Sequence, residues 1–297
     1  MKLEPECILC QIKVREEELL TLLEDKRKVL EALSNILRLL IDGIEKNLPI
    51  NQIATYAFRH VKKITNCEDP YKEYKEKTNS IAEKLSAKIE IELEKLKDPV
   101  KRFRRTCIIA TLSNAIDPGV AGHTFKEKEL VERLLHEEPY IDDTQKLLQH
   151  VKNSKNILYL ADNSGEIFFD KILIKELKKC GTKVTFVVKS GPFQNDVTLE
   201  DTLNASIDKV ADEVITTGSD AAGVIMEECS KEFLEKLEEA DLIIAKGLAN
   251  YESLTEYTNI IKKPIAYFLV AKCEPIARSL KAKKGTSIIK LHQYSKY

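Results

Sequence analysis

The spacing of apolar residues divides the chain into two halves with different periods. From position 16 to about position 137, apolar residues recur every three or four positions with charged residues between them. This period is typical of amphipathic helices. Turn sequences that contain proline interrupt it at 47–49, 67–70, 98–99 and 117–119. Residues 1–150 are therefore predicted to form an all-helical domain.

After position 150, short apolar runs rich in β-branched residues alternate with amphipathic stretches. The runs predict strands at 156–160, 183–188, 213–216, 241–245, 265–270 and, at an edge, 287–291. The stretches between them predict helices at 167–179, 199–209, 226–237 and 254–262. This alternation favours consecutive βαβ units with right-handed crossovers. The predicted fold class is α/β: residues 151–297 form a doubly wound, mostly parallel α/β/α Rossmann-like sheet, and the helical domain packs on it across a cleft.

Polar side chains follow the predicted strands at their carboxyl ends. Asp162 and Asn163 follow the first strand, and Asp196 lies beyond the second. The carboxyl ends of parallel strands meet at one edge of a sheet, which is where ligands bind in this class of fold. Two carboxylates and an amide oxygen suit Mg²⁺ or Mn²⁺ with water at the remaining positions. Asp162, Asn163 and Asp196 are therefore the predicted metal ligands.

The same edge carries groups that favour an anion. Lys246 and Asn250 follow the fourth strand and Lys272 follows the fifth. The two lysines are expected to contact phosphoryl oxygens, and the N–H groups around Ser164, Gly165 and Glu166 are expected to bind the remaining negative charge.

Each of these residues also has a structural interpretation. Asp162 and Asn163 suit a helix N-cap as well as a metal. Considered alone, Lys246 is consistent with a solvent-exposed lysine at a strand end, and Asn250 with an ordinary loop residue. Their shared position at one edge of the sheet favours the ligand site.

The segments at these strand ends resemble those of the damage-control phosphatase family, specifically its archaeal branch, over most of the chain. They are ADNSGE at 161–166, GPFQNDVT at 191–198, KGLANYE at 246–252 and LVAKC at 269–273. The resemblance implies that Asp162, Asn163 and Asp196 hold a divalent ion, with Mg²⁺, Mn²⁺, Co²⁺ and Ni²⁺ as candidates. It also implies hydrolysis of phosphate esters of sugars and other small metabolites, with Asp162, Asp196 and Lys272 at the reacting centre.

The helical half contains two further segments similar to the family, at 69–72 and 113–117. Asn114 and Asp117 are expected to reach into the cleft and contact the substrate. For Asp117, a turn together with Pro118 is an equally good interpretation.

Cys7 and Cys10 form a CxxC pair similar to one in the archaeal branch. A single pair lacks the second ligand pair of a structural zinc site, although Cys67 is a candidate third ligand. The alternative is two thiols on one helical turn. The five histidines form no Ser/His/Asp or HExxH arrangement, so hydrolysis by those routes has no support.

The composition of the chain limits the classes of binding partner that are expected. The 297 residues carry a formal net charge of −1, which gives no electrostatic reason for a nucleic acid or a membrane surface as partner. A small phosphorylated metabolite is the expected partner. The charged start of the chain and the lack of a long apolar segment predict a cytoplasmic location.

These features predict a divalent-metal-dependent phosphatase that hydrolyses phosphate monoesters of small metabolites. The alternative is a protein that binds a nucleotide or S-adenosylmethionine, such as a methyltransferase, because the same sheet supports those functions. Only one glycine follows the first strand, however, rather than GxGxxG. A third interpretation is a noncatalytic scaffold. The sequence does not assign the substrate, the general base or the oligomeric state.

Overall fold

In residues 1–115 and 127–294, the part of the chain that the computed structural model describes, seven strands form one sheet. They are β1 (Ile141–Asp142), β2 (Asn156–Leu160), β3 (Lys183–Val188), β4 (Glu213–Thr216), β5 (Leu242–Lys246), β6 (Ile265–Val270) and β7 (Ser287–His292). Their order across the sheet is β1-β7-β6-β5-β2-β3-β4. All neighbours are parallel except β6 and β7. The predicted fold class is confirmed.

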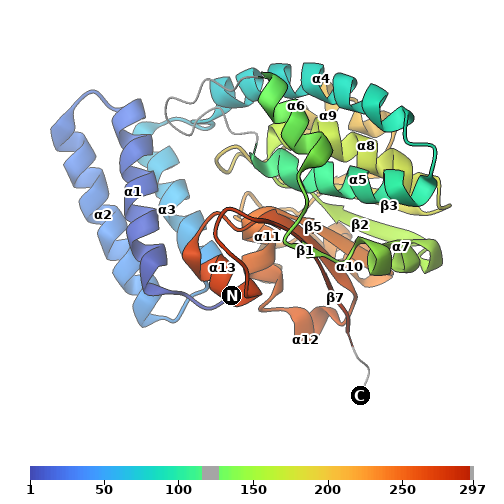
Figure 1. The fold of residues 1–297 in the computed structure, drawn as a ribbon. Helices are drawn as coiled ribbons and strands as arrows, with labels where there is room; N and C mark the ends of the chain where they lie inside the picture. Colours follow the sequence, from blue (N-terminus) through green and yellow to red (C-terminus); the bar gives the residue numbers. More distant parts are fainter. Residues whose placement is uncertain (116–126, 295–297) are drawn as a thin grey trace.

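The helices cover both faces of this sheet and form a bundle beside it (Figure 1). The α-helices are α1 (Pro5–Leu22), α2 (Lys26–Glu45), α3 (Ile50–Thr65), α4 (Lys72–Glu94), α5 (Pro99–Leu112), α6 (Glu127–His136), α7 (Thr144–Asn153), α8 (Ile167–Lys178), α9 (Leu199–Asn204), α10 (Lys231–Glu239), α11 (Gly247–Leu254), α12 (Thr258–Ile261) and α13 (Glu274–Leu280). Short 3₁₀ turns are η1 (Ser113–Ala115), η2 (Ser164–Glu166), η3 (Ile207–Lys209) and η4 (Met226–Glu228).

The direction of winding reverses between β2 and β5. From β2 the chain proceeds to β3 and β4 on one side, and the crossover helices α8 and α9 lie with α4 and α5 on one face. From β5 it proceeds to β6 and β7 on the other side, with α11 and α13 on the opposite face. A reversal of this kind opens a crevice at the carboxyl ends of the two central strands. It places the ends of β2 and β5 side by side.

The helical half divides between two hydrophobic cores. Helices α1, α2 and α3 form a core of their own, with Leu19, Ile36 and Val61 at its centre. Helices α4 and α5 instead bury Leu85, Ile89 and Phe103 against the sheet, in the core that contains β2 and β3. The strand β1 also lies before position 150 and pairs with β7. Helices α4–α7 pack in the same hydrophobic core as the sheet. A domain boundary at 150 stays a prediction.

Most predicted strand bounds are confirmed within one residue, but three helices differ from prediction. The predicted helix 199–209 ends at Asn204, because the chain turns at Ser206 with a positive φ. The predicted helix 226–237 is the turn η4 followed by α10, which Ser230 caps by accepting from Phe233 N. The predicted helix 254–262 is wrong: α11 begins directly after β5 at Gly247, and α12 follows.

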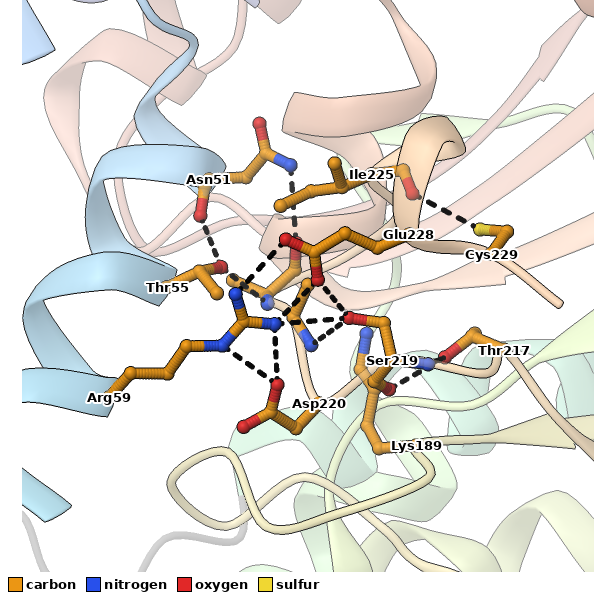
Figure 2. Close-up of polar contacts among 12 residues, drawn as sticks. Asn51, Thr55, Arg59, Lys189, Thr217, Ser219, Asp220, Ile225, Glu228 and Cys229 are labelled. Atoms are coloured by element: carbon orange, nitrogen blue, oxygen red, sulfur yellow. Dashed lines mark hydrogen bonds and ion pairs between the residues drawn. The ribbon is translucent and has the colours of Figure 1, made fainter. Parts of the chain in front are cut away.

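Helix α3 contacts the loop after β4 through a set of polar bonds that we call the α3 interface, formed by Asn51, Thr55 and Arg59 with residues 219–228 (Figure 2). Asn51 Nδ2 donates to the carbonyl oxygens of Ala222 and Val224, both at 3.2 Å. Thr55 Oγ1 accepts from Ala222 N at 3.0 Å. The guanidinium of Arg59 pairs with Asp220 and Glu228.

The α3 interface is reinforced by an apolar cluster of Ala54, Phe58, Phe193 and Ala222. It joins the helical bundle to the loops that follow β3 and β4. Separately, no helix among the described residues has both the length and the hydropathy needed to cross a bilayer.

Candidate active site

The segment after β2 is fixed against the segment after β3 by backbone hydrogen bonds. Val197 N donates to Asp162 O, and Ser164 N donates to Asn195 O, both at 2.9 Å. Asn163 and Asp196 form an isolated antiparallel bridge. Residues that face each other in such a bridge have neighbouring side chains. The structure therefore brings Asn163 and Asp196 together, next to Asp162, as the sequence predicted.

Two amides join the carboxylates of Asp162 and Glu166. Asn114 Nδ2 donates to Asp162 Oδ2 at 2.7 Å and also to Glu166 Oε1. Asn163 Nδ2 donates to the same two oxygens, at 2.8 Å for Asp162. Asn114 comes from η1, at the end of α5, so the expectation that it reaches the cleft is met by this contact. Asp117, expected beside it, lies outside the described residues.

Lys246 does not contact the opening at the sheet edge. Its side chain is 0 % exposed, and its Nζ lies 2.7 Å from both Glu166 Oε2 and Asp170 Oδ1. Tyr159 OH donates to the same Asp170 oxygen at 2.7 Å. The expected contact of Lys246 with phosphate does not fit this geometry, because both of its carboxylate partners come from η2 and α8 beneath the site. Lys246 neutralises those carboxylates and orients Glu166.

The turn at Ser164–Glu166 is also engaged within the protein. Ser164 N and Glu166 N donate to backbone carbonyls, and Ser164 Oγ donates to Asn79 Oδ1 at 2.9 Å. A Cβ on Gly165 would lie 2.4 Å from Thr78 Cγ2, so α4 covers this glycine. The predicted phosphate contacts of Ser164 N and Glu166 N do not fit this arrangement. The covered glycine also argues against close approach of a dinucleotide pyrophosphate.

Asn250 has a structural contact that the sequence did not indicate. Its Nδ2 donates to Ala161 O at 3.0 Å and to Lys246 O at 2.8 Å, and the residue is buried. It therefore fastens α11 to the ends of β2 and β5.

Gly247 allows α11 to start in contact with Asp162. Its φ is +75°, and a Cβ there would lie 2.0 Å from Asp162 Oδ2. Gly247→Ala is therefore expected to cost at least about 1–2 kcal/mol from the backbone conformation alone. Displacement of the Asp162 carboxylate adds to that cost. Urea unfolding measures the loss, with Gly181→Ala as the control, since Gly181 has a φ of +84° but open space at its Cβ. Equal losses in both variants would contradict the close contact with Asp162.

Burial shifts the pKa values of the acidic residues. It raises the pKa of Asp162 well above its usual value, and the charges of Glu166 and Asp196 add to the effect. Burial also raises the pKa of Asp196 to about 6, partly offset by Lys189, whose Nζ lies 3.8 Å from Asp196 Oδ2. For Glu166, burial opposes ionisation, but the charge and hydrogen bond of Lys246, together with the charge of Lys272 and the hydrogen bond from Asn114, outweigh it and lower the pKa. Burial therefore opposes the ionisation of both Asp162 and Asp196, and of these two only Asp196 has an ion-pair partner among the described residues.

The balance of buried charge fits a divalent cation. Among the described residues at this edge, the buried carboxylates are Asp162, Glu166, Asp170 and Asp196, and the fully buried cations beside them are Lys189 and Lys246. Lys246 is shared by Glu166 and Asp170, Lys189 pairs with Asp196, and Asp162 has no ion-pair partner among the described residues, so four carboxylates face two buried lysines. The Oδ1 atom of Asn114 is buried and finds no donor in the described part of the chain. Such oxygens are the ligands that Mg²⁺ and Mn²⁺ prefer.

Acidic side chains alone do not form this candidate metal site. Over residues 1–115 and 127–294, no three His, Cys, Asp or Glu side chains are arranged to hold a metal ion. The candidate donor set here instead combines two carboxylates with the amides of Asn114 and Asn163. Among the described residues, therefore, Cys7 and Cys10 are not part of a three-residue metal-binding group. They line a cavity together with Cys273, and Cys67 is not among the lining residues of that cavity.

Lys272 lies at the open side of the site. It is exposed at the end of β6, and its charge lowers the pKa of both Asp162 and Glu166. The described structure therefore places a lysine near the carboxylates, with its ammonium group accessible to a ligand.

The comparisons with known proteins agree on one family. A family model described as the damage-control phosphatase ARMT1-like domain matches residues 3–288. A damage-control phosphatase of Archaeoglobus fulgidus is 37% identical over 295 residues, 98% of this chain and 99% of that protein. The damage-control phosphatase PH1575 of Pyrococcus horikoshii is 34% identical over 97% of both chains.

A relative from Methanocaldococcus jannaschii, the uncharacterized protein MJ0202, is 41% identical over 97% of this chain and 95% of its own. The crystal structure of PH1575, described as a DUF89 family protein, superposes with a TM-score of 0.88 at 33% identity and covers 99% of this chain and all of that one. The resemblance predicted from the strand-end segments is therefore confirmed. The chain belongs to the damage-control phosphatase ARMT1-like family, and it is an enzyme of the phosphatase class.

Proposed function

We propose that this chain hydrolyses phosphate monoesters of small metabolites with a divalent metal ion, at the edge of the sheet where β2 and β5 end. The observation that carries the proposal is the excess of buried negative charge around Asp162, which has no ion-pair partner among the described residues and lies close to Glu166 and Asp196. Family membership is consistent with a divalent metal cofactor.

Asp162, Asn163 and Asp196 would hold the cation, with Asn114 beside them. Turning the Asn163 amide about its last bond would exchange its N–H₂ for its carbonyl oxygen, and the two orientations have nearly the same shape. When bound, the cation would supply charge neutralisation for the phosphoryl group and would lower the pKa of a water molecule.

The chain's own residues bind and orient the substrate. Lys272 is the exposed cation at the site, and we assign it the phosphoryl oxygens. Asp162 and Asp196 are the carboxylates placed to accept the proton of the attacking water. Glu166, Lys246 and Asp170 act beneath them as positioning residues, since their mutual contacts are buried.

Activity is tested with p-nitrophenyl phosphate and a panel of sugar phosphates under Mg²⁺, Mn²⁺, Co²⁺ and Ni²⁺. Hydrolysis by the purified protein supports the proposal. An absence of hydrolysis with every metal and every ester would contradict it.

Removing the metal is expected to abolish hydrolysis, because the phosphoryl charge would then face the carboxylates of Asp162 and Asp196 without a cation between them. Dialysis against EDTA followed by the p-nitrophenyl phosphate assay measures the loss, and adding back the divalent ion restores the rate. Full activity in the chelated protein, with metal content verified by elemental analysis, would exclude the assigned site.

A further inference from the structure

From a buried arginine next to this site we infer the class of substrate: a phosphate monoester that carries a second anionic group, a carboxylate or a second phosphate, which Arg15 binds. The inference rests on the proposed function, since the phosphate to be cleaved occupies the site at the ends of β2 and β5. The inference concerns the end of the substrate molecule that lies away from the phosphate to be cleaved.

A cavity of about 330 Å³ lies between the helical bundle and the strand-end loops. Helix α1 contributes Arg15, and α3 contributes Ala54. Leu248 and Ala249 line it directly after Gly247, the residue against Asp162, and Lys272 lines it as well. The cavity therefore adjoins the proposed phosphatase site and shares Lys272 with it. Its size suits a small metabolite.

Arg15 is 1% exposed and is underused as a hydrogen-bond donor. Its Nη2 lies 3.1 Å from Glu18 Oε1, whereas its Nε and Nη1 find no acceptor within the described residues. A buried guanidinium can donate five hydrogen bonds, and each buried donor without an acceptor destabilises the folded protein. Neither nitrogen is matched by an acceptor in the described structure, so both are available to an anion that enters the cavity.

Glu18 contacts Arg15 through its Oε1 atom alone, which three donors share, while Glu18 Oε2 is buried without a donor among the described residues. Tyr71 OH donates to Oε1 at 2.8 Å and Gln194 Nε2 donates to it at 3.0 Å, in addition to Arg15. The guanidinium also packs on the Phe58 ring, 5.2 Å from its centroid. These contacts hold the arginine in place from one side and leave two of its nitrogen atoms for a ligand.

The acidic residues of the cavity wall do not cancel this charge. Glu6 pairs with Arg278 at 2.8 Å, outside the cavity. Burial raises the pKa of Glu252 to about 7, so near neutral pH this carboxyl is partly protonated. Arg15 and Lys272 are thus the basic lining residues, one at the inner wall and one at the shared edge. An anionic group bound by Arg15 and a phosphate bound beside Lys272 belong to the two ends of one small molecule.

The test compares two esters of equal length, 3-phosphoglycerate and glycerol 3-phosphate, of which only the first has a carboxylate. In the wild-type protein, kcat/KM is expected to favour 3-phosphoglycerate by roughly 10- to 100-fold, as for a hydrogen-bonded buried charge. Arg15→Gln is expected to bring the two values within about threefold, and Arg15→Lys to give an intermediate ratio. Arg102→Gln, which removes a remote pair with Glu176, is the matched control and keeps the wild-type ratio.

Glu18→Gln tests the role of Arg15 by changing its ion-pair partner. This variant is also informative if Arg15→Gln does not fold. It keeps an acceptor for Tyr71 and Gln194 but removes the charge opposite Arg15, so the ratio is expected to equal or exceed that of the wild type. A wild-type ratio near one, or a wild-type ratio retained in Arg15→Gln, overturns the inference.

Failure of the inference and failure of the proposed function give different results. Hydrolysis of p-nitrophenyl phosphate, which has no second anion, reports on the proposed function alone. If no ester is hydrolysed, calorimetric titration of the same two compounds in the presence of Mn²⁺ yields their affinity ratio without turnover. Equal affinities for the two compounds would then overturn the role of Arg15.

Discussion

Asp162→Asn is expected to lower kcat/KM for phosphate monoesters by about 10³-fold or more, because it removes the charge that holds a divalent cation at the reacting centre. The amide has nearly the shape of the carboxylate and can still accept from Asn114 and Asn163, which contact Asp162 Oδ2. The change also relieves a buried charge, since burial holds the pKa of Asp162 well above its usual value. Stability is therefore expected to be equal to or greater than that of the wild type.

The measurement is steady-state hydrolysis of p-nitrophenyl phosphate with saturating metal, together with a thermal melt of the same sample. Asp42→Asn is the control, since the Asp42 side chain on α2 is half-exposed and pairs with Lys46, far from the candidate site. Wild-type activity in an Asp162→Asn, Asp196→Asn double variant would show that the metal and the phosphate are bound elsewhere.

Lys246→Met is expected to destabilise the protein by about 3–5 kcal/mol, because it leaves two buried carboxylates without their shared cation. Glu166 and Asp170 both lie 2.7 Å from Lys246 Nζ, and neither is exposed by more than 3 %. Methionine has a similar volume, so lost packing contributes little. Loss of activity is expected as well, since Glu166 would no longer be held beside Asn114 and Asn163.

Urea denaturation gives the change in unfolding free energy. Lys46→Met, which breaks an exposed pair on α2, is expected to change it by less than about 1 kcal/mol. Adding Glu166→Gln and Asp170→Asn to Lys246→Met is expected to recover most of the loss, because no unpaired buried charge then remains. A Lys246→Met protein as stable as the wild type would contradict the buried charge network.

The strands from β2 onward were predictable because each contains a short run of apolar, mostly buried residues, whereas the two-residue strand β1 has no such run and was not predicted. β2, β3 and β6 match their predicted ranges for this reason. The start of α11 was not predictable from periodicity. It depends on Gly247, whose positive φ turns the chain from β5 into a helix with no preceding loop. The packing of α4 on η2 depends equally on a long-range contact, between Thr78 and Gly165.

At the candidate site, the position of each residue along its strand was predictable, but the direction of its side chain was not. Asn163 and Asp196 follow their strands and face each other in a bridge, and Asp162 accepts from Val197 N beside them. Lys246 is the last residue of β5, and its side chain lies on the face that α8 covers, so it points beneath the site. The signal that was available is Asp170, an acidic residue on the buried stripe of α8, which needs a basic partner. Arg15 on α1 gave no such signal, because its ion pair with Glu18 is local, whereas Phe58 and the strand-end residues of its cavity come from distant parts of the chain.

The α3 interface bears on how substrates enter and leave. Asn51 and Thr55 bond to main-chain atoms of the loop that lines the cavity, so the bundle and the sheet cannot part without exposing unpaired peptide groups. Because this part of the cavity wall is already ordered, little binding free energy is lost in ordering it when a ligand binds. Product release should then be limited by the unbinding of the product itself, rather than by a hinge motion of the two halves.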